Sequence, residues 1–558
     1  MKLVECVPNF SEGKDMNVIK QITDAIESVS GTILLDVDPG AATNRTVITF
    51  IGTPEAVLES AFLAIKKGSE LIDMSKHKGE HPRMGACDVC PFVPVSDISV
   101  EECVEIAKKL GERVANELNI PVYLYEYAAT EPKRKSLANI REGEYEGLKE
   151  KIKDPLWKPD FGKAEFNPKS GATVIGVRDF LIAYNINLNT KDAKLATQIA
   201  NVIREKGYPK KDENGKIVKD ENGNTIYIPG LLKECRAIGW FVDDYNIAQI
   251  SINLTNWKVT PPHIAYEKAT DEASRIGVKV TGSELVGLIP KDALIEAGKY
   301  YLKKQNKSTG LPEKEILYIA IKSLGLDTLY PFEIEKKVIE YAYESKMNKK
   351  KLISMSIKDF CDELSTDSPA PGGGSVAALS GSIAASLVSM VANLTFGKKG
   401  YEKYNDEVDD IASNSQKIKD IMLGLIDLDT EAFNYYMEVF KMPKKSEEEK
   451  RIRDEKLKEA TKKAIDVPLK TLETIKELLP YLEKITQKGN VNSISDAGVS
   501  ALNLLSCAEG AYMNILINLK NLTDENYKNN IREKSKKLLD EINQRCEKVK
   551  VEVYKIIG

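Results

Sequence analysis

The hydrophobic periodicity of the chain changes once, and this change limits the fold more than any other feature. Up to Leu288, apolar side chains follow alternating strand and helix patterns, whereas beyond Ile357 only the helical spacing remains. Phe360 and Leu364 continue that spacing, as does the run from 418 to 428. The sequence therefore predicts an α/β half followed by an all-α half.

The first 127 residues read as one α/β layer. Pro54 begins a helix in a first turn where a missing amide hydrogen costs nothing, and Ser99 with Glu102 forms a capping box for a helix that ends near Leu118. Strands are expected at 3–7, 32–36, 45–51, 89–95 and 121–127, with a further helix at 16–29.

A second unit begins near Phe180. Its signals run strand 180–188, helix through Arg204, strands around Trp240 and Ile250, helix after Pro261 and strand 278–288. This order is the split βαβ, or ferredoxin-like, arrangement. The repeat of Asp-Glu-Asn-Gly at 212–215 and 220–223 predicts a surface hairpin insertion without a chemical role.

Composition excludes several classes of protein. Lys and Arg total 80 against 84 Asp and Glu, a net charge of -4, whereas a nucleic-acid binder would carry a strongly basic domain. The first residues show an early charge and no apolar core, so we expect no export signal. Eight scattered cysteines fit reduced thiols, and we expect a cytoplasmic protein.

One uncharged stretch, 368–397, is long enough to suggest a membrane span. Its Gly, Ser and Ala content is too high to partition well into lipid. As a helix from Ser375 it places Ala377, Gly381, Ala385 and Ser389 along one stripe, which lets two backbones approach closely. We therefore expect a buried helix in a bundle or at a subunit contact.

The segment His77-Lys-Gly-Glu-His81-Pro-Arg-Met-Gly85 holds two of the three histidines of the chain. Glycine and proline make it a poor helix, so it can present several proton donors, acceptors and cations together. It is either an ordinary polar loop or a site of proton transfer. A zinc site with Cys87 and Cys90 is a rival interpretation, but the spacing is too short for a zinc finger, and we expect no metal.

Two further features in the second half point to chemistry. Asp429 has apolar neighbours three and four positions away, whereas Asp427 has Thr430 and Glu431, so Asp429 is expected to face the core with a raised pKa. It is either an acid or a structural aspartate. The glycines at 372–374 open a helix and expose its first amides, as an anion site or a hinge.

Together these motifs resemble formimidoyltransferase-cyclodeaminase. The segments that carry the resemblance, spread over both halves, are 4–13 (VECVPNFSEG), 44–46 (NRT), 77–85 (HKGEHPRMG), 185–188 (NINL) and 370–376 (APGGGSV). The resemblance implies transfer of a formimidoyl group from formiminoglutamate to tetrahydrofolate, then closure to 5,10-methenyltetrahydrofolate with release of ammonia. It also implies a homo-oligomer, an octamer, and tetrahydrofolate, polyglutamylated, as the folate substrate.

The resemblance also implies the layout of the chain. We expect two ferredoxin-like α/β subdomains at 1–179 and 180–326, a linker at 327–356 that includes the lysine run 346–351, and an all-α domain at 357–558. By family position the catalytic histidine is His81 and the cyclodeaminase aspartate is Asp429. The expected folate-binding loop comprises Gly162, Lys163, Ala164, Glu165, Phe166, Asn167, Pro168, Lys169, Ser170 and Gly171.

The chemistry adds candidates. A histidine that accepts and returns a proton would serve attack by the folate nitrogen and departure of glutamate, and the spacing alone does not choose between His77 and His81. Arg45 and Arg83 are candidates for holding a dicarboxylate, since their fork suits carboxylates. Gly372, Gly373 and Gly374 are candidates for binding a folate carboxylate or ring carbonyl. Two alternatives are a cyclohydrolase second half and a folate-binding scaffold without catalysis.

Overall fold

The computed structural model describes residues 2–40, 44–78, 82–243, 245–347 and 351–558. The chain divides into two compact units. The first comprises Met1–Ala297 with Leu324–Asn348, and the second Gly298–Ser323 with Lys349–Gly558.

A mixed sheet forms the centre of the first subdomain. Its strand order is β3, β4, β1 with β2, β5, β7 and β6, where β1 and β2 both lie between β4 and β5. All pairs are antiparallel except that β6 and β7 run parallel to each other and β7 parallel to β5. The strands are β1 (Leu3–Cys6), β2 (Asn9–Phe10), β3 (Thr32–Gly40), β4 (Arg45–Gly52), β5 (Cys87–Ser96), β6 (Val122–Glu126) and β7 (Thr173–Val177). The ferredoxin-like core is thus confirmed, with a parallel extension added.

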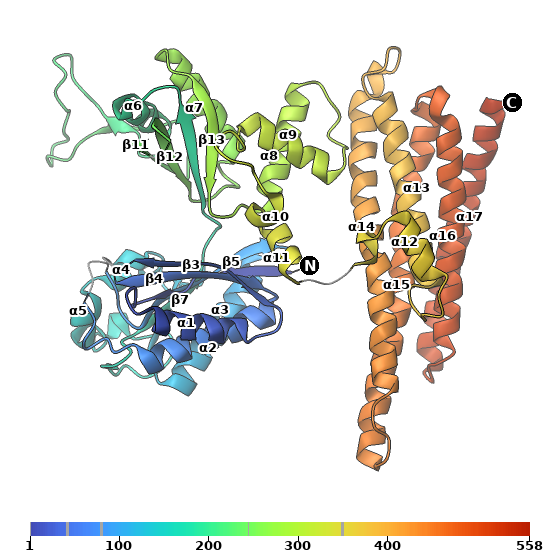
Figure 1. Ribbon diagram of the computed structural model, residues 1–558, viewed down its shortest axis with the longest axis horizontal. Helices are drawn as coiled ribbons and strands as arrows, with labels where there is room; N and C mark the ends of the chain where they lie inside the picture. Colours follow the sequence, from blue (N-terminus) through green and yellow to red (C-terminus); the bar gives the residue numbers. More distant parts are fainter. Residues whose placement is uncertain (1, 41–43, 79–81, 244, 348–350) are drawn as a thin grey trace. The chain divides into compact units, whose positions relative to one another are not determined.

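Three helices, α1 (Met16–Glu27), α2 (Pro54–Leu71) and α3 (Val100–Leu118), cover one face of this sheet (Figure 1). Their starts follow from capping: Asp15 and Thr53 cap α1 and α2, and the predicted capping box of Ser99 and Glu102 is present. On the opposite face, Ile140 of α4 (Leu137–Arg141) and Leu148 of α5 (Glu144–Lys151) are buried among apolar strand residues.

The second subdomain has the predicted ferredoxin-like order. Its antiparallel strands lie in the order β11 (Cys235–Val242), β12 (Ile247–Leu254), β8 (Ile182–Leu188) and β13 (Val280–Val286), with helices α6 (Ala193–Ile203) and α7 (Pro262–Arg275). The hairpin insertion extends from β9 (Tyr208–Pro209) and β10 (Tyr227–Ile228). Gly215 and Gly223 have φ of 78° and 82° at its two turns, a conformation that favours glycine.

Four helices that the sequence patterns did not predict follow: α8 (Lys291–Lys304), α9 (Glu313–Leu324), α10 (Ile334–Lys337) and α11 (Ile339–Met347). The loop between α8 and α9 packs within the second unit, where the Asp409 carboxylate accepts hydrogen bonds from the Ser308 hydroxyl at 3.0 Å and the Thr309 amide at 2.6 Å. The predicted linker, 327–356, includes α10 and α11 and is therefore partly helical. The Tyr343 hydroxyl in α11 donates a hydrogen bond to the carbonyl of Gly31 at 3.3 Å.

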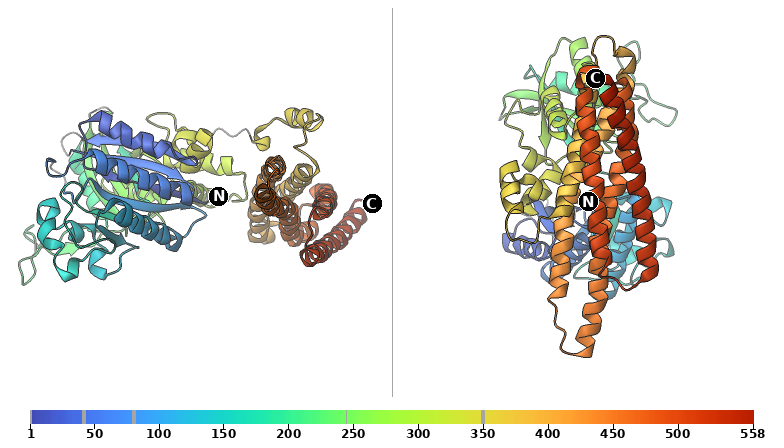
Figure 2. Two further views of the ribbon diagram at one scale, coloured as in Figure 1. Left: turned by 90° about the horizontal axis from the view of Figure 1, so that it is seen from below. Right: turned by 90° about the vertical axis from the view of Figure 1, so that its right-hand side faces the viewer.

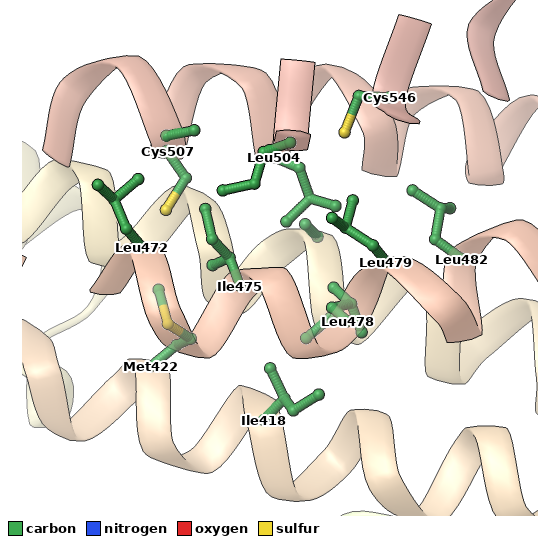
Figure 3. Packing of buried hydrophobic residues seen from close by; sticks show 14 of the residues in the cluster. Ile418, Met422, Leu472, Ile475, Leu478, Leu479, Leu482, Leu504, Cys507 and Cys546 are labelled. Carbon is green, nitrogen blue, oxygen red and sulfur yellow. The ribbon is translucent and has the colours of Figure 1, made fainter. Parts of the chain in front are cut away.

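The second unit is the predicted helical bundle, whose long helices run side by side (Figure 2). They are α13 (Gly373–Thr395), α14 (Asn405–Phe440), α15 (Glu447–Lys488), α16 (Ile494–Leu519) and α17 (Glu525–Ile557), and the short helix α12 (Ile357–Leu364) precedes them. Met422, Ile475 and Cys507 from three of these helices meet in the core shown in Figure 3. A Cβ on Gly381 of α13 would lie only 2.3 Å from the Met422 Cε, so the small-residue stripe permits this close packing.

Among the described residues, α13 is the one helix long and apolar enough to cross a membrane, and 61% of its apolar window is buried inside the protein. This burial matches the expected helix of a bundle interior, since the apolar side chains already have protein neighbours.

Candidate active sites

His81 lies outside the described residues, but the other histidine of its segment is placed. The Nε2 of His77 lies 2.9 Å from the carbonyl oxygen of Asn44, and the Nε of Arg83 donates to the His77 Nδ1 at 3.3 Å. Because an arginine nitrogen only donates, Nδ1 must accept, and the proton then resides on Nε2. Both ring nitrogens of His77 are thus engaged, which suits positioning rather than proton transfer.

Arg83 is held by protein carboxylates. Its guanidinium donates to Glu144 at 2.9 Å and to Glu146 at 2.7 and 2.8 Å, and these hydrogen bonds, with that to Glu146 the largest cause, raise the pKa of Arg83. The side chain is buried. With its fork occupied, Arg83 ties the end of the histidine segment to α5, and the geometry favours this role over the predicted contact with a dicarboxylate.

Arg45 lies in a different environment. Its Nη1 donates to the buried Asp88 carboxylate at 2.7 Å, and its Nε donates to the Asn9 Oδ1 at 3.0 Å. Asp88 also accepts from the Met84 amide at 2.9 Å and from the Arg141 Nη2. Burial lowers the pKa of Arg45, which nevertheless stays charged. Sequence reasoning found Arg45 but missed Asp88 and Arg141, because their association needs the fold.

The predicted folate loop, 162–171, packs against the end of the histidine segment and the residue that follows it. The Ser170 carbonyl accepts from the Ala86 amide at 2.9 Å, and the Ala172 amide beyond the loop donates to the Met84 carbonyl at 3.1 Å. Gly171 has φ of 66°, and a Cβ there would lie 2.1 Å from the Met84 oxygen. Residues 162–165 are exposed and open to a ligand. The two predicted segments are therefore neighbours.

The cysteines of the rival zinc interpretation are buried in the apolar core. Burial raises the pKa of the Cys87 thiol well above its ordinary value, which disfavours the thiolate that zinc requires. The Cys90 sulfur lies 3.5 Å from that of Cys6. Within the described ranges, no group of three His, Cys, Asp or Glu side chains is arranged to hold a metal ion.

Glu5 in β1 is a titratable group that sequence reasoning missed. It is 5% exposed, and burial raises its pKa to about 7, against the opposing effect of Arg178. Glu5 lies within the segment 4–13 that carries the resemblance, yet as a single acidic residue between apolar ones it gives no signal in the sequence. A carboxyl group that titrates near neutral pH can exchange protons under working conditions.

In the helical unit, Asp429 and the glycines 372–374 line one cavity of about 290 Å³. The Asp429 carboxylate accepts a hydrogen bond from the Ser375 hydroxyl at 3.0 Å, and burial raises its pKa. Other lining residues are Pro369, Ala370, Phe433, Tyr436, Thr461, Ala464, Asn514, Ile517, Asn518 and Asn521. The expected raised pKa is present, but Asp429 is only partly buried and borders a cavity instead of the apolar core.

Asp427 is less different from Asp429 than the sequence indicated. Burial raises the pKa of Asp427 too, and its Oδ1 accepts from the Leu352 amide at 2.6 Å. This hydrogen bond comes from the residues that precede α12, which periodicity within α14 cannot reveal. Asp427 is not among the residues that line the cavity, so location separates the two aspartates.

Asn514 and Asn518 are further cavity residues that sequence reasoning missed. The Asn514 Nδ2 donates to the Gly510 carbonyl and the Asn518 Nδ2 to the Ala464 carbonyl, both at 2.8 Å. With their amide nitrogens held by backbone, the oxygens remain as acceptors for N–H groups of a ligand. Asparagines four residues apart on the apolar helix α16 were the available signal.

Gly374→Ala is expected to lower the rate at the helical site strongly. A Cβ at Gly374 would lie 2.1 Å from the Asp429 Oδ1, so the carboxylate must move by more than an ångström. Such a misplacement typically costs about 100-fold in rate. The ring closure that the resemblance implies for this half measures it, with Gly372→Ala as the matched control, because a Cβ there meets nothing closer than 3.9 Å. Equal activity of the two variants would contradict the assigned geometry.

Asp429→Asn is expected not to lower the stability of the protein at neutral pH. Because burial raises the folded-state pKa above the unfolded value, the native state binds more protons between the two values, and the carboxylate destabilises the fold once pH exceeds the folded pKa. Asparagine removes this effect. The variant should therefore have a higher Tm than the unaltered protein at neutral pH. This difference in Tm should disappear below about pH 4, where the carboxyl group is protonated in both the folded and the unfolded state. A wild-type advantage that grows with pH would contradict this sign.

Known protein families match both the α/β half and the helical half of the chain. Family models match at residues 3–178 (formiminotransferase domain, N-terminal subdomain), 183–344 (formiminotransferase domain) and 356–537 (formiminotransferase-cyclodeaminase). The formimidoyltransferase-cyclodeaminase of Rattus norvegicus is 44% identical over 541 residues, which cover 97% of this chain and 96% of the relative.

Other relatives match only part of the chain. The glutamate formimidoyltransferase of Thermoplasma acidophilum is 47% identical over 54% of this chain and 93% of its own length. The methenyltetrahydrofolate cyclohydrolase of Methylorubrum extorquens is 40% identical over 30% of this chain and 81% of its own length. The solved formiminotetrahydrofolate cyclodeaminase of Thermotoga maritima is 32% identical and covers 37% of this chain and 100% of its own, with a TM-score of 0.34.

The match to the Rattus norvegicus protein extends over both halves in one order and nearly the full length of each chain. The chain therefore belongs to the formimidoyltransferase-cyclodeaminase family.

Proposed function

We propose that this protein transfers the formimidoyl group of N-formimidoyl-L-glutamate to tetrahydrofolate in its first half and cyclises the product to 5,10-methenyltetrahydrofolate in its second. The observation that carries the second activity is one cavity that holds Asp429 beside the first turn of α13. The first activity rests on relatives named for it and on the packing of the 162–171 loop against the histidine segment.

In the transferase step, His81 acts as the proton carrier. The folate N5 attacks the amidine carbon, His81 accepts the proton that N5 loses, and the same proton goes to the nitrogen of the departing glutamate. The carbon–nitrogen bond to glutamate then breaks. The engagement of both His77 nitrogens supports the choice of His81, since His77 has no free position for this exchange.

In the cyclodeaminase step, Asp429 performs the corresponding exchange. The folate N10 attacks the carbon of the formimidoyl group in its protonated, amidinium form and gives its own proton to the carboxylate. The carboxyl group then protonates the resulting amino group, and the carbon–nitrogen bond breaks to release ammonia and leave the methenyl cation. A raised pKa suits a carboxyl group that must both accept and return a proton. The amides of Gly373 and Gly374, at the start of α13, bind an anionic or carbonyl group of the folate.

A cyclohydrolase second half is the alternative, supported by the match to methenyltetrahydrofolate cyclohydrolase. That reaction opens the methenyl ring with water and releases no ammonia. Purified protein given 5-formimidoyltetrahydrofolate should release ammonia as methenyl absorbance rises. Ammonia-free turnover of methenyltetrahydrofolate would instead favour the alternative.

The remaining assignments are part of the same proposal. The folate substrate is polyglutamylated tetrahydrofolate, and the reactions require no metal. The protein acts in the degradation of histidine and is located in the cytoplasm. All eight cysteines are free, as reduced thiols require.

We also propose a homo-oligomer, an octamer by resemblance. Ile383 and Leu394 of α13 and Leu502 and Met513 of α16 are 42% to 63% exposed, and such apolar side chains on the surface favour contact with another subunit. Light scattering tests the assembly.

A further inference from the structure

Arg45 and Arg141 share a single aspartate. Arg45 donates to the Asp88 Oδ2 at 2.7 Å, and the Arg141 Nη2 donates to the same oxygen. The side chains of the two arginines are only 12% and 14% exposed, and that of Asp88 is 1% exposed. Among the described side chains of this largely buried cluster, two positive charges share one negative charge, which is a surplus of one positive charge.

The cluster differs from the sites of Arg83 and Arg134 in the same subdomain. Arg83 forms ion pairs with two carboxylates, Glu144 and Glu146. The buried Arg134 forms an ion pair with Asp160 at 2.7 Å. Burying a charge without an equal partner is costly, and the positive charge of Arg141 adds to burial in lowering the pKa of Arg45. A bound anion would remove the imbalance.

Arg141 also keeps hydrogen-bonding capacity in reserve. Its Nε is buried and has no hydrogen-bond partner, and its one recorded protein partner among the described residues is Asp88, through Nη2. Arg45, by contrast, uses Nε, Nη1 and Nη2 on Asn9 and Asp88. The unused donors therefore belong to Arg141, which ends α4.

The position of Arg141 is fixed by its neighbours. The Lys151 ammonium donates to the carbonyl oxygens of Asn139, Ile140 and Glu142, each at 2.9 Å, and so holds the backbone on both sides of Arg141. A donor group whose backbone is held in advance binds a ligand with little loss of conformational freedom. Asp88, in turn, accepts from the Met84 amide, which is three residues after His81 in the sequence.

We propose that Arg141, with Arg45 and the bridging Asp88, forms the docking site for a carboxylate of a transferase substrate. The planar fork of arginine fits a carboxylate, and one carboxylate neutralises the cluster. This inference rests on the proposed transferase function. Two substrates carry such a group, the formimidoyl donor with its glutamate carboxylates and the folate with its glutamate tail.

Arg141→Gln tests the proposal, because Asp88 keeps Arg45 as its partner. Loss of a charged hydrogen bond should raise one KM by about 10- to 100-fold with little change in kcat. A rise in the KM for formiminoglutamate assigns the site to the donor, and a rise in the KM for tetrahydrofolate assigns it to the folate. Arg141→Lys, which keeps the charge but loses the fork, should give an intermediate rise.

The controls separate this inference from the function on which it rests. Arg113→Gln removes another arginine that is paired with carboxylates, Glu59 and Glu117, and should change neither KM. Cyclodeaminase activity of each variant verifies that the chain has folded. Unchanged values of both KM in Arg141→Gln, or a loss of kcat alone, would overturn the docking site. Absence of glutamate release by the unaltered protein would instead overturn the transferase function.

Discussion

Replacement of His81 with alanine is expected to lower the rate of glutamate release by about 10²- to 10⁴-fold, the usual contribution of general acid–base catalysis. Departure of glutamate needs a proton on its nitrogen, and a histidine supplies one near neutral pH. Glutamate release from formiminoglutamate and tetrahydrofolate measures the loss. Cyclisation of supplied 5-formimidoyltetrahydrofolate should survive, because that reaction is assigned to the other unit.

His77→Gln is the matched control. The His77 Nε2 holds the carbonyl of Asn44, and a glutamine amide can still donate there, so this variant should lose much less activity. A severe loss in His77→Gln together with an active His81→Ala would exchange the two roles.

Asp429→Asn is expected to lower ammonia release by about 10²- to 10⁴-fold while glutamate release continues. Asparagine can still accept the Ser375 hydrogen bond, so the geometry is kept and only proton exchange is lost. The protein should accumulate 5-formimidoyltetrahydrofolate. Coupled detection of ammonia and glutamate in one reaction separates the two losses.

Asp427→Asn is the control for this second prediction. The Asp427 side chain accepts from the Leu352 amide, which asparagine can also satisfy, and it does not border the cavity. Cyclisation should therefore persist. If Asp427→Asn were inactive and Asp429→Asn active, the catalytic assignment would move to the other aspartate.

Local signals predicted much of the fold. Ser99 and Glu102 marked the start of α3, and Asn-Gly pairs marked the turns of the hairpin insertion, because caps and turns depend on residues close in sequence. Helices α8 and α9 were missed. The contact of their connecting loop with Asp409 joins residues 100 positions apart, and such contacts leave no local pattern.

The candidate sites show the same limit. Asp429 and the glycines 372–374 were found separately, each from its own neighbours, but their meeting in one cavity depends on the packing of α13 against α14. Arg83 is a reasonable carboxylate-binding residue in the sequence, yet Glu144 and Glu146, more than 60 positions later, occupy it. Arg141 was not predicted as a site residue because its ion pair with Asp88 joins residues 53 positions apart, and no pattern near Arg141 in the sequence indicates it.

The most direct test of two successive reactions in one chain is a time course on the unaltered protein that follows glutamate, ammonia and methenyl absorbance together. Starting from formiminoglutamate and tetrahydrofolate, the three products should reach equal final amounts, with glutamate never behind ammonia. Methenyl formation without ammonia, or ammonia in excess of glutamate, would contradict the proposed sequence of reactions.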